Sequence, residues 1–172
     1  MMSNISNFSN VSDYLPILNS VIITDIFVIT LLIKGLIKSK VLENWYRNLT
    51  LSAVIADVLI IVIGIILARF LYPFIFSNYS LTTFLLLAVL IQITHDILFY
   101  LFSISIQRGK SKILDIFKDY GKEKGTGAII ADSLMMISSI LIASYLKGKT
   151  LNANIIILIF SIYLVPYMVY TV

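Results

Sequence analysis

Five long apolar stretches dominate the sequence, each close to the length that crosses a bilayer as a helix. A spanning helix needs about 20 mostly apolar residues, and backbone groups in lipid must pair within the segment. The runs are continuous rather than alternating, which favours helices over barrel strands. The sequence therefore predicts an all-α, polytopic transmembrane helix bundle. Its five spans are expected at about 14–33, 49–71, 81–106, 127–145 and 152–172.

The composition excludes an ordinary soluble domain. Of 172 residues, 59% are hydrophobic and 13% are charged, whereas soluble domains carry about 25% charged residues. A water-soluble fold of this size could not hide so much apolar surface. The expected organisation is a polar tail over 1–13, outside the membrane, followed by a single transmembrane bundle over 14–172. The absence of cysteine excludes disulfides and thiolate metal sites, and neither a metal nor a cofactor is predicted.

The basic residues predict the orientation. The linker after the first span and the linker after the third together hold ten of the thirteen Lys and Arg residues, and the loop 72–80 between them has no charge. The positive-inside rule places the basic linkers in the cytoplasm, the N-terminus outside and the C-terminus inside. Lys147 and Lys149 lie on the opposite side against this rule, and Arg69 near the outer end of its span is expected to snorkel. The net charge of +4 therefore indicates anionic lipids at the cytoplasmic face rather than nucleic acid.

The third linker carries an apolar face between charged residues. This pattern predicts a short amphipathic helix lying on the cytoplasmic leaflet. Several aromatic residues near the predicted span ends are expected to form an interfacial belt. The apolar face comprises Ile113, Leu114, Phe117 and Tyr120, and the belt comprises Trp45, Tyr46, Tyr72, Phe76 and Tyr79.

Asn-x-Ser triplets occur in the segments expected outside. Such triplets are candidate glycan acceptors if these segments enter a secretory lumen. The alternative for the first thirteen residues is a polar, disordered tail without modification. The candidate acceptors are Asn4, Asn7, Asn10 and Asn78.

An internal duplication is visible in the spans. Ala53–Asp57 (AVIAD) matches Ala128–Asp132 (AIIAD) 75 residues later, and seven of sixteen positions agree between 53–68 and 128–143. Ser39–Leu42 likewise resembles Ser111–Leu114. The chain is therefore predicted to contain a tandem two-helix repeat in parallel orientation, over about 14–77 and about 81–150, plus a fifth helix.

The repeat places small residues on one helical face in each copy. Small residues let helices approach closely in lipid. We expect the second and fourth spans to pack against each other, or against the first and third, through these faces. The residues are Ala53, Gly64 and Ala68 in the first copy and Ala128, Ser139 and Ala143 in the second.

Four carboxylates lie inside predicted spans: Asp25, Asp57, Asp96 and Asp132. Each ionised carboxylate at mid-helix costs roughly 2.5–3.5 kcal/mol, so four of them are not expected to face lipid. Each lies eight to twelve residues from a flanking Lys or Arg, which places all four at a similar depth, about 12–18 Å from the basic linkers. His95, the only histidine, neighbours Asp96.

A group of carboxylates at one depth is typical of proton or cation handling. Oxygen ligands would suit a hard cation such as Na⁺, Mg²⁺ or Ca²⁺, and a soft-metal site is not expected. The alternative is structural: a protonated aspartate can hydrogen-bond a hydroxyl across helices and only hold them together. A lone histidine is likewise more often a packing residue than a ligand.

The stretch Asp119–Met136 (DYGKEKGTGAIIADSLMM), with its shorter counterpart Ala53–Ile60 (AVIADVLI), is similar to uncharacterised multi-pass proteins encoded by large nucleocytoplasmic DNA viruses. The richness in Asn, Ile and Lys is typical of such low-GC genomes. The resemblance covers about a third of the chain. It implies a virion or host-derived membrane, and it assigns no role to any residue.

Two function classes follow. In the first, the bundle is a pathway for protons, cations or a small solute, lined by the four aspartates and His95. In the second, it is a non-catalytic structural or assembly protein of a viral or organelle membrane. No enzyme motif is visible: the spans contain neither HExxH nor GxSxG, and the chain has no phosphate-binding glycine loop. We therefore do not expect an enzyme. A homo-oligomer remains open.

Overall fold

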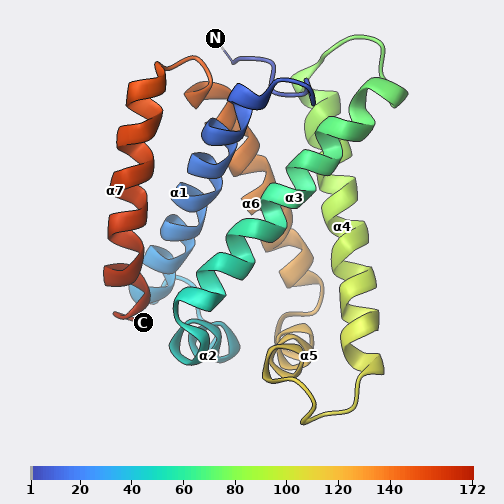
Figure 1. The fold of residues 1–172 in the computed structure, drawn as a ribbon. Coiled ribbons are helices and arrows are strands. Elements are labelled where there is room, and N and C mark those ends of the chain that lie inside the picture. The colour runs from blue at the N-terminus through green and yellow to red at the C-terminus, as the bar shows by residue number, and fades with distance from the viewer. Residues whose placement is uncertain (1) are drawn as a thin grey trace.

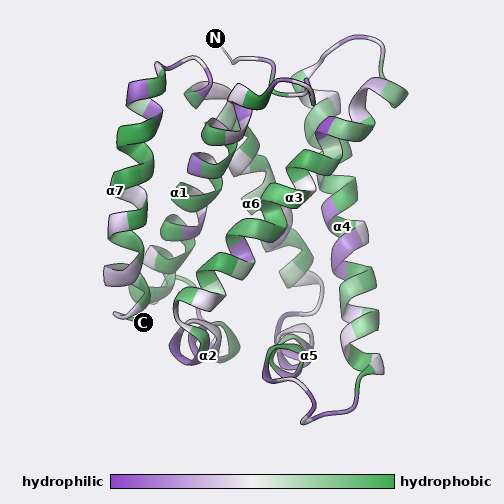
Figure 2. Ribbon diagram, viewed as in Figure 1, coloured by the Kyte–Doolittle hydropathy of each residue, from purple (hydrophilic) through white to green (hydrophobic). Residues whose placement is uncertain are grey.

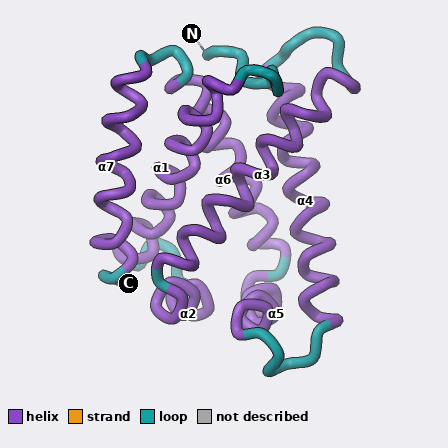
Figure 3. The backbone as a smooth tube through the Cα atoms, in the orientation of Figure 1, coloured by secondary structure: helices purple, strands orange, loops and turns teal. Residues whose placement is uncertain are grey.

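A computed structural model describes residues 2–172, which form seven α-helices and one short 3₁₀ turn, with no strand in that range. Figure 3 shows how the helices follow one another through short loops. The structure confirms the all-α fold and five helices long and apolar enough to span a membrane. These are α1 (Tyr14–Ile33), α3 (Leu51–Ile75), α4 (Leu81–Ser105), α6 (Thr126–Leu146) and α7 (Leu151–Val169).

The long helices form one bundle (Figure 1). Helix α1 packs against α3, α6 and α7, whereas α4 packs against α3 and α6. The two remaining helices, α2 (Lys40–Leu49) and α5 (Lys112–Lys124), contact each other at one end of the bundle and lie across it. We call this the basic end, and the opposite end, where residues 2–13 lie, the cap end. The N-terminus lies at the cap end and the C-terminus at the basic end, as an odd number of spans requires.

The surface of the spans is apolar, which suits lipid. Figure 2 shows the long helices mostly in the hydrophobic colour, with the hydrophilic colour concentrated in α2, α5 and a few bands within the bundle. Large apolar side chains such as Phe74, Leu86 and Phe160 point outward and are 64–75% exposed. In water this arrangement would expose a large apolar patch. In a bilayer the same side chains meet hydrocarbon.

Helix α5 confirms the amphipathic helix predicted after the third span, but α2 was not anticipated. The sequence predicts only a linker over residues 40–49. Both helices begin after a serine whose Oγ accepts a backbone N–H three residues later, Ser39 from Leu42 at 3.1 Å and Ser111 from Leu114 at 3.4 Å. These N-caps satisfy amide groups that would otherwise be unpaired.

The turns from α2 into α3 and from α5 into α6 have the same backbone geometry. Thr50 has φ 49° and ψ −123°, and Gly125 has φ 52° and ψ −127°. This positive-φ conformation suits glycine and strains a β-branched residue. Each turn redirects the chain abruptly from the helix that lies across the bundle end into a span.

Gly64 lies where α3 meets α6 and α4, whereas α3 and α6 as whole helices pack mainly against the first and third spans, α1 and α4. A Cβ atom on Gly64 would lie 2.8 Å from Met136 Cε on α6, so the flexible end of Met136 would have to move, and 3.7 Å from Gln92 Oε1 on α4. Contacts between α3 and α6 themselves are few. Ala53, Gly64, Ala68, Ser139 and Ala143 are buried, whereas Ala128 is only half-buried.

Residues 2–13 fold over the cap end instead of forming a free tail. Ile5 is fully buried, and Phe8 packs edge-to-face on Phe70 at 5.4 Å between ring centroids. Ser3 and Ser144 exchange two hydrogen bonds, from Ser3 N to Ser144 O and from Ser144 Oγ to Ser3 O. These contacts bind the segment to α3 and α6, so the disordered-tail interpretation is wrong.

Arg69 does not snorkel as predicted. Its side chain is fully buried and forms an ion pair with the equally buried Asp13 at 3.3 Å. The guanidinium also donates to the carbonyl oxygens of Asn7 and Asn10. Lys147 reaches the same carboxylate at 2.8 Å. Asp13 thus pairs with both Arg69 and Lys147, the second of which is one of the two lysines that go against the positive-inside rule.

The aromatic belt prediction is also only partly right. Trp45, Tyr46 and Tyr72 are buried in the protein and are 1–4% exposed. Tyr72 Oη accepts the Ser80 backbone N–H at 2.9 Å and so closes the loop between α3 and α4. The polar atoms of these rings find partners within the fold, which explains why they are not at a lipid interface.

Candidate functional site

Asp25 on α1 is fully buried near the basic end of the bundle. The phenol of Tyr46, from α2, donates to Asp25 Oδ1 at 3.0 Å. The other oxygen, Oδ2, has no hydrogen-bond partner among the described residues. A buried carboxylate with one satisfied oxygen has capacity left for a proton or a further donor.

Asp57 on α3 is held by the neighbouring residue of α2. The indole Nε1 of Trp45 donates to Asp57 Oδ2 at 2.9 Å. Consecutive residues of α2 therefore reach two different spans, Trp45 to α3 and Tyr46 to α1. The tight turn at Thr50 makes this possible, because it folds α2 back across the end of the bundle.

On α4, Asp96 is held within its own helix. Gln92 Nε2 donates to Asp96 Oδ1 at 2.7 Å, and His95 Nδ1 lies 3.3 Å from the same oxygen. The imidazole stacks on Phe99 at 5.6 Å between ring centroids. Asp96 Oδ2 is buried and unpartnered, as is one oxygen of Asp25.

Asp132 on α6 completes the group, and its charged neighbours are Asp96 and Asp57. Tyr120 of α5 lies among these three carboxylates. Burial raises the pKa of Tyr120, and the negative charges of Asp132, Asp57, Glu123 and Asp96 raise it further. We call Asp25, Asp57, Asp96 and Asp132 the carboxylate cluster.

Tyr46 links Asp25 to the rest of the cluster. Burial raises the pKa of its phenol, and the charges of Asp57 and Asp25 raise it further. Tyr46 and Tyr120 both remain protonated at neutral pH, so each can donate a hydrogen bond. All four predicted aspartates therefore lie in the half of the bundle nearer the basic end, with Tyr46 or Tyr120 from a crossing helix beside them, whereas His95 approaches only Asp96.

The cluster is not arranged as a metal site. Within residues 2–172 no three His, Asp or Glu side chains are placed to hold a metal ion. A hard cation would need six or more oxygen ligands.

Trp45, Tyr46 and Tyr120 are the site residues that sequence reasoning did not assign. A signal for two of them was present. Trp45 precedes Asp57 by twelve residues, and Tyr120 precedes Asp132 by the same twelve. Recognising it required knowing that the two intervening turns fold the chain back in the same way.

The candidate glycan acceptors lie at the cap end. Asn4, Asn7 and Asn10 each accept, through Oδ1, the backbone N–H of the serine two residues later. Asn10 Nδ2 also donates to Asp13 at 2.9 Å. Asn4, Asn7 and Asn78 are exposed, whereas Asn10 is half-buried.

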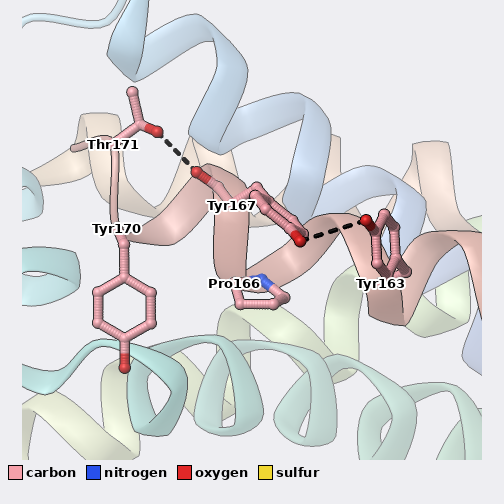
Figure 4. Close-up of a pocket in the computed structure, with 5 residues that line it drawn as sticks. All are labelled: Tyr163, Pro166, Tyr167, Tyr170 and Thr171. Atoms are coloured by element: carbon pink, nitrogen blue, oxygen red, sulfur yellow. Dashed lines mark hydrogen bonds between the residues drawn. The ribbon is translucent and has the colours of Figure 1, made fainter.

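Two surface cavities lie away from the carboxylate cluster. One of about 480 Å³ is lined by the end of α7, where Tyr167 Oη donates to Tyr163 Oη at 3.2 Å and Thr171 Oγ1 donates to the Tyr167 carbonyl (Figure 4). The other, of about 360 Å³, lies where α4 turns into α5. Neither is lined by an aspartate.

Comparisons of the chain with known protein families, with curated proteins and with solved structures found no match. The fold itself defines the class. With five apolar helices of spanning length, the chain is a multi-pass integral membrane protein.

Proposed function

We propose that the carboxylate cluster binds protons and passes them between the basic end and the interior of the bundle. The observation that carries this proposal is the convergence of four carboxylates from four spans, each with no more than light hydrogen bonding. Asp25 and Asp96 each keep one oxygen without a partner. Carboxylates whose charges act on one another in a medium of low polarity are not expected to ionise all at once, so shared protons are expected.

A proton suits the site better than the cation or solute alternatives. The donors that reach the cluster are the N–H of Trp45, the O–H of Tyr46 and the amide of Gln92. Such donors can stabilise a carboxylate but cannot replace the water around a metal cation. Neighbouring hydroxyl and carboxyl groups can hand on a proton with only small movements.

A second candidate is the structural or assembly role, and a specific observation favours it as well. Trp45 and Tyr46 fasten α2 to α3 and α1 through Asp57 and Asp25. Hydrogen bonds between helices in lipid are worth about 0.6–2 kcal/mol each. On this alternative the aspartates hold the bundle together and move nothing.

We further infer that the chain consists of two parallel copies of one unit, α1–α2–α3 and α4–α5–α6, followed by α7. Contacts support this: α1 packs on α3 as α4 packs on α6, and α1 packs on α6 as α4 packs on α3. The serine caps and the matching turns at Thr50 and Gly125 support it too. The unit is therefore a span, a short crossing helix and a second span.

The basic end is proposed to face the cytoplasm. It holds the ten basic residues of the two linkers, and at the cap end Asp13 pairs with Arg69 and Lys147. The positive-inside rule then applies with few exceptions. This orientation places α2, α5 and the carboxylate cluster on the cytoplasmic side.

Reconstituted liposomes with a pH gradient and an internal pH dye would test the proton role. Wild type should dissipate the gradient, and Asp57→Asn or Asp132→Asn should abolish the flux while the helical content is unchanged. Glu43→Gln is the matched control, because it removes one carboxylate from an exposed position of α2. Its flux should equal that of wild type.

A wild-type chain that is folded and carries no flux would overturn the proton role. The structural role instead predicts a change in thermal stability. It requires Asp57→Asn and Asp25→Asn to lower the unfolding temperature clearly, whether or not wild type carries flux. Measuring both quantities on the same preparations separates the two candidates.

A further inference from the structure

The cavity at the turn from α4 into α5 has an unusual combination of linings. Three cationic side chains, Arg108, Lys118 and Lys122, meet two isoleucines, Ile104 and Ile106, around a volume of about 360 Å³. Gln107 completes the lining. No carboxylate lines this cavity, although the linker as a whole contains three of them.

Lys118 is a built part of this cavity rather than a mobile surface lysine. Its side chain is only 6% exposed. The ammonium donates to the Ile106 carbonyl at 2.7 Å and to Asp115 Oδ1 at 3.0 Å. An ammonium has three N–H donors, so one remains for a ligand.

The other two cations complete a positive rim. Arg108 forms an exposed ion pair with Asp119 through one side of its guanidinium. Lys122 forms no ion pair with any residue from 2 to 172. The segment 107–124 contains six basic and three acidic residues, a net charge of 6 − 3 = +3. The cavity is therefore suited to an anion.

The position of the cavity selects the kind of anion. Ile104 lies in the last turn of α4 and is 50% exposed on the apolar surface of that span. Arg108 and Lys122 line the same cavity as Ile104, at the edge of that apolar surface. An apolar wall beside a cationic rim at the end of a span matches the acyl chain and phosphate of one phospholipid.

We propose that this cavity binds the phosphate headgroup of an anionic phospholipid, with the acyl chains running along α4. Arg108 and Lys122 contact the phosphate from the exposed rim of the cavity, and Lys118 contacts it from the buried wall. This proposal is independent of the proton role, since it concerns different residues and is measured without a pH gradient.

Native mass spectrometry of the full chain, released from detergent micelles that contain phosphatidylcholine and titrated with phosphatidylglycerol, would test it. One phosphatidylglycerol should be retained per chain in preference to phosphatidylcholine. Arg108→Gln and Lys122→Gln should each weaken this binding about fivefold, which corresponds to about 1 kcal/mol per basic residue. The charge-preserving changes Arg108→Lys and Lys122→Arg should restore most of the affinity.

The matched control is the double variant Lys34→Gln and Lys40→Gln. It removes two charges from exposed positions at the same end of the bundle, outside the cavity. The comparison is with the double variant that combines Arg108→Gln and Lys122→Gln. If the control weakens binding as much as that double variant does, the attraction is a general surface effect and the site is overturned. If glycerol phosphate alone binds as tightly as phosphatidylglycerol, the ligand is a soluble phosphate compound and the lipid assignment fails.

If the double variant with Arg108→Gln and Lys122→Gln does not fold, the wild-type chain still provides a test. A specific headgroup site should retain one phosphatidylglycerol at salt concentrations that remove the others. A gradual loss of all bound lipid with salt, with no last molecule retained, would also overturn the proposal.

Discussion

Thr50 and Gly125 lie 75 residues apart in the sequence and share one backbone conformation, with φ and ψ values that agree within 4°. Each ends a helix that crosses the basic end and begins a span. A glycine adopts this geometry freely, whereas a threonine is strained in it by about 1–3 kcal/mol. The same bend is thus made by Gly125 without strain and by Thr50 with strain.

Replacing Thr50 with glycine should therefore stabilise the protein by about 1 kcal/mol, after the greater flexibility of an unfolded glycine is subtracted. Gly125→Ala should destabilise it by about 1 kcal/mol or more, although no atom lies within 4 Å of the added Cβ. Thermal unfolding in nanodiscs would measure both. Equal unfolding temperatures for the three proteins would contradict the matched strain.

The buried pair at the cap end should be far more sensitive to charge removal. Asp13→Asn leaves the buried Arg69 and the adjoining Lys147 without a counter-charge, which should cost about 3–5 kcal/mol. Hydrogen exchange of residues 2–13 should rise with the loss of stability. Asp119→Asn provides the control, because its ion pair with Arg108 is solvent-exposed and its removal should leave the unfolding temperature unchanged. Similar effects of the two changes would argue against a buried clamp.

The hydrogen bond from Tyr46 to Asp25 can be isolated with a double-mutant cycle. Tyr46→Phe removes only the hydroxyl and should destabilise the protein by about 1–3 kcal/mol, because the fully buried carboxylate loses its donor. The loss should shrink when Asp25→Asn is already present. Purely additive effects would show that the two groups do not interact in the membrane.

Glu123 gives a prediction about pH. The Ser39 hydroxyl, the Val41 N–H and the Lys124 ammonium lower the pKa of Glu123 below its ordinary value of 4.5. Its contribution to stability is therefore complete above that value and is lost as the pH falls through the lowered pKa. Unfolding temperatures of wild type and Glu123→Gln should differ at pH 7, and the difference should shrink as the pH falls below 4.5 and through the lowered pKa. A difference that is the same at every pH, with no decrease in acid, would contradict this assignment.

Much of the membrane architecture was predictable because it depends on local properties. The five spans follow from the length of each apolar run, and the cost of an ionised group in lipid already marked Asp25, Asp57, Asp96 and Asp132 as residues that must face inward. Helix α5 was predictable from its apolar period. Helix α2 was missed because its ten residues carry two aromatic rings that were assigned to the lipid interface.

The partners that polar side chains find across the bundle were not predictable. Asp13 meets Lys147 across 134 residues, and Asn19 Nδ2 meets the Asn154 carbonyl across 135. Such pairings depend on how the helices pack, and no spacing in the chain encodes them. The sequence by itself determined which segments enter lipid, because hydrophobicity and backbone pairing act within each segment. Only the tertiary structure decided that residues 2–13 cap the bundle and that α2 reaches the aspartates, because both depend on contacts between distant parts of the chain.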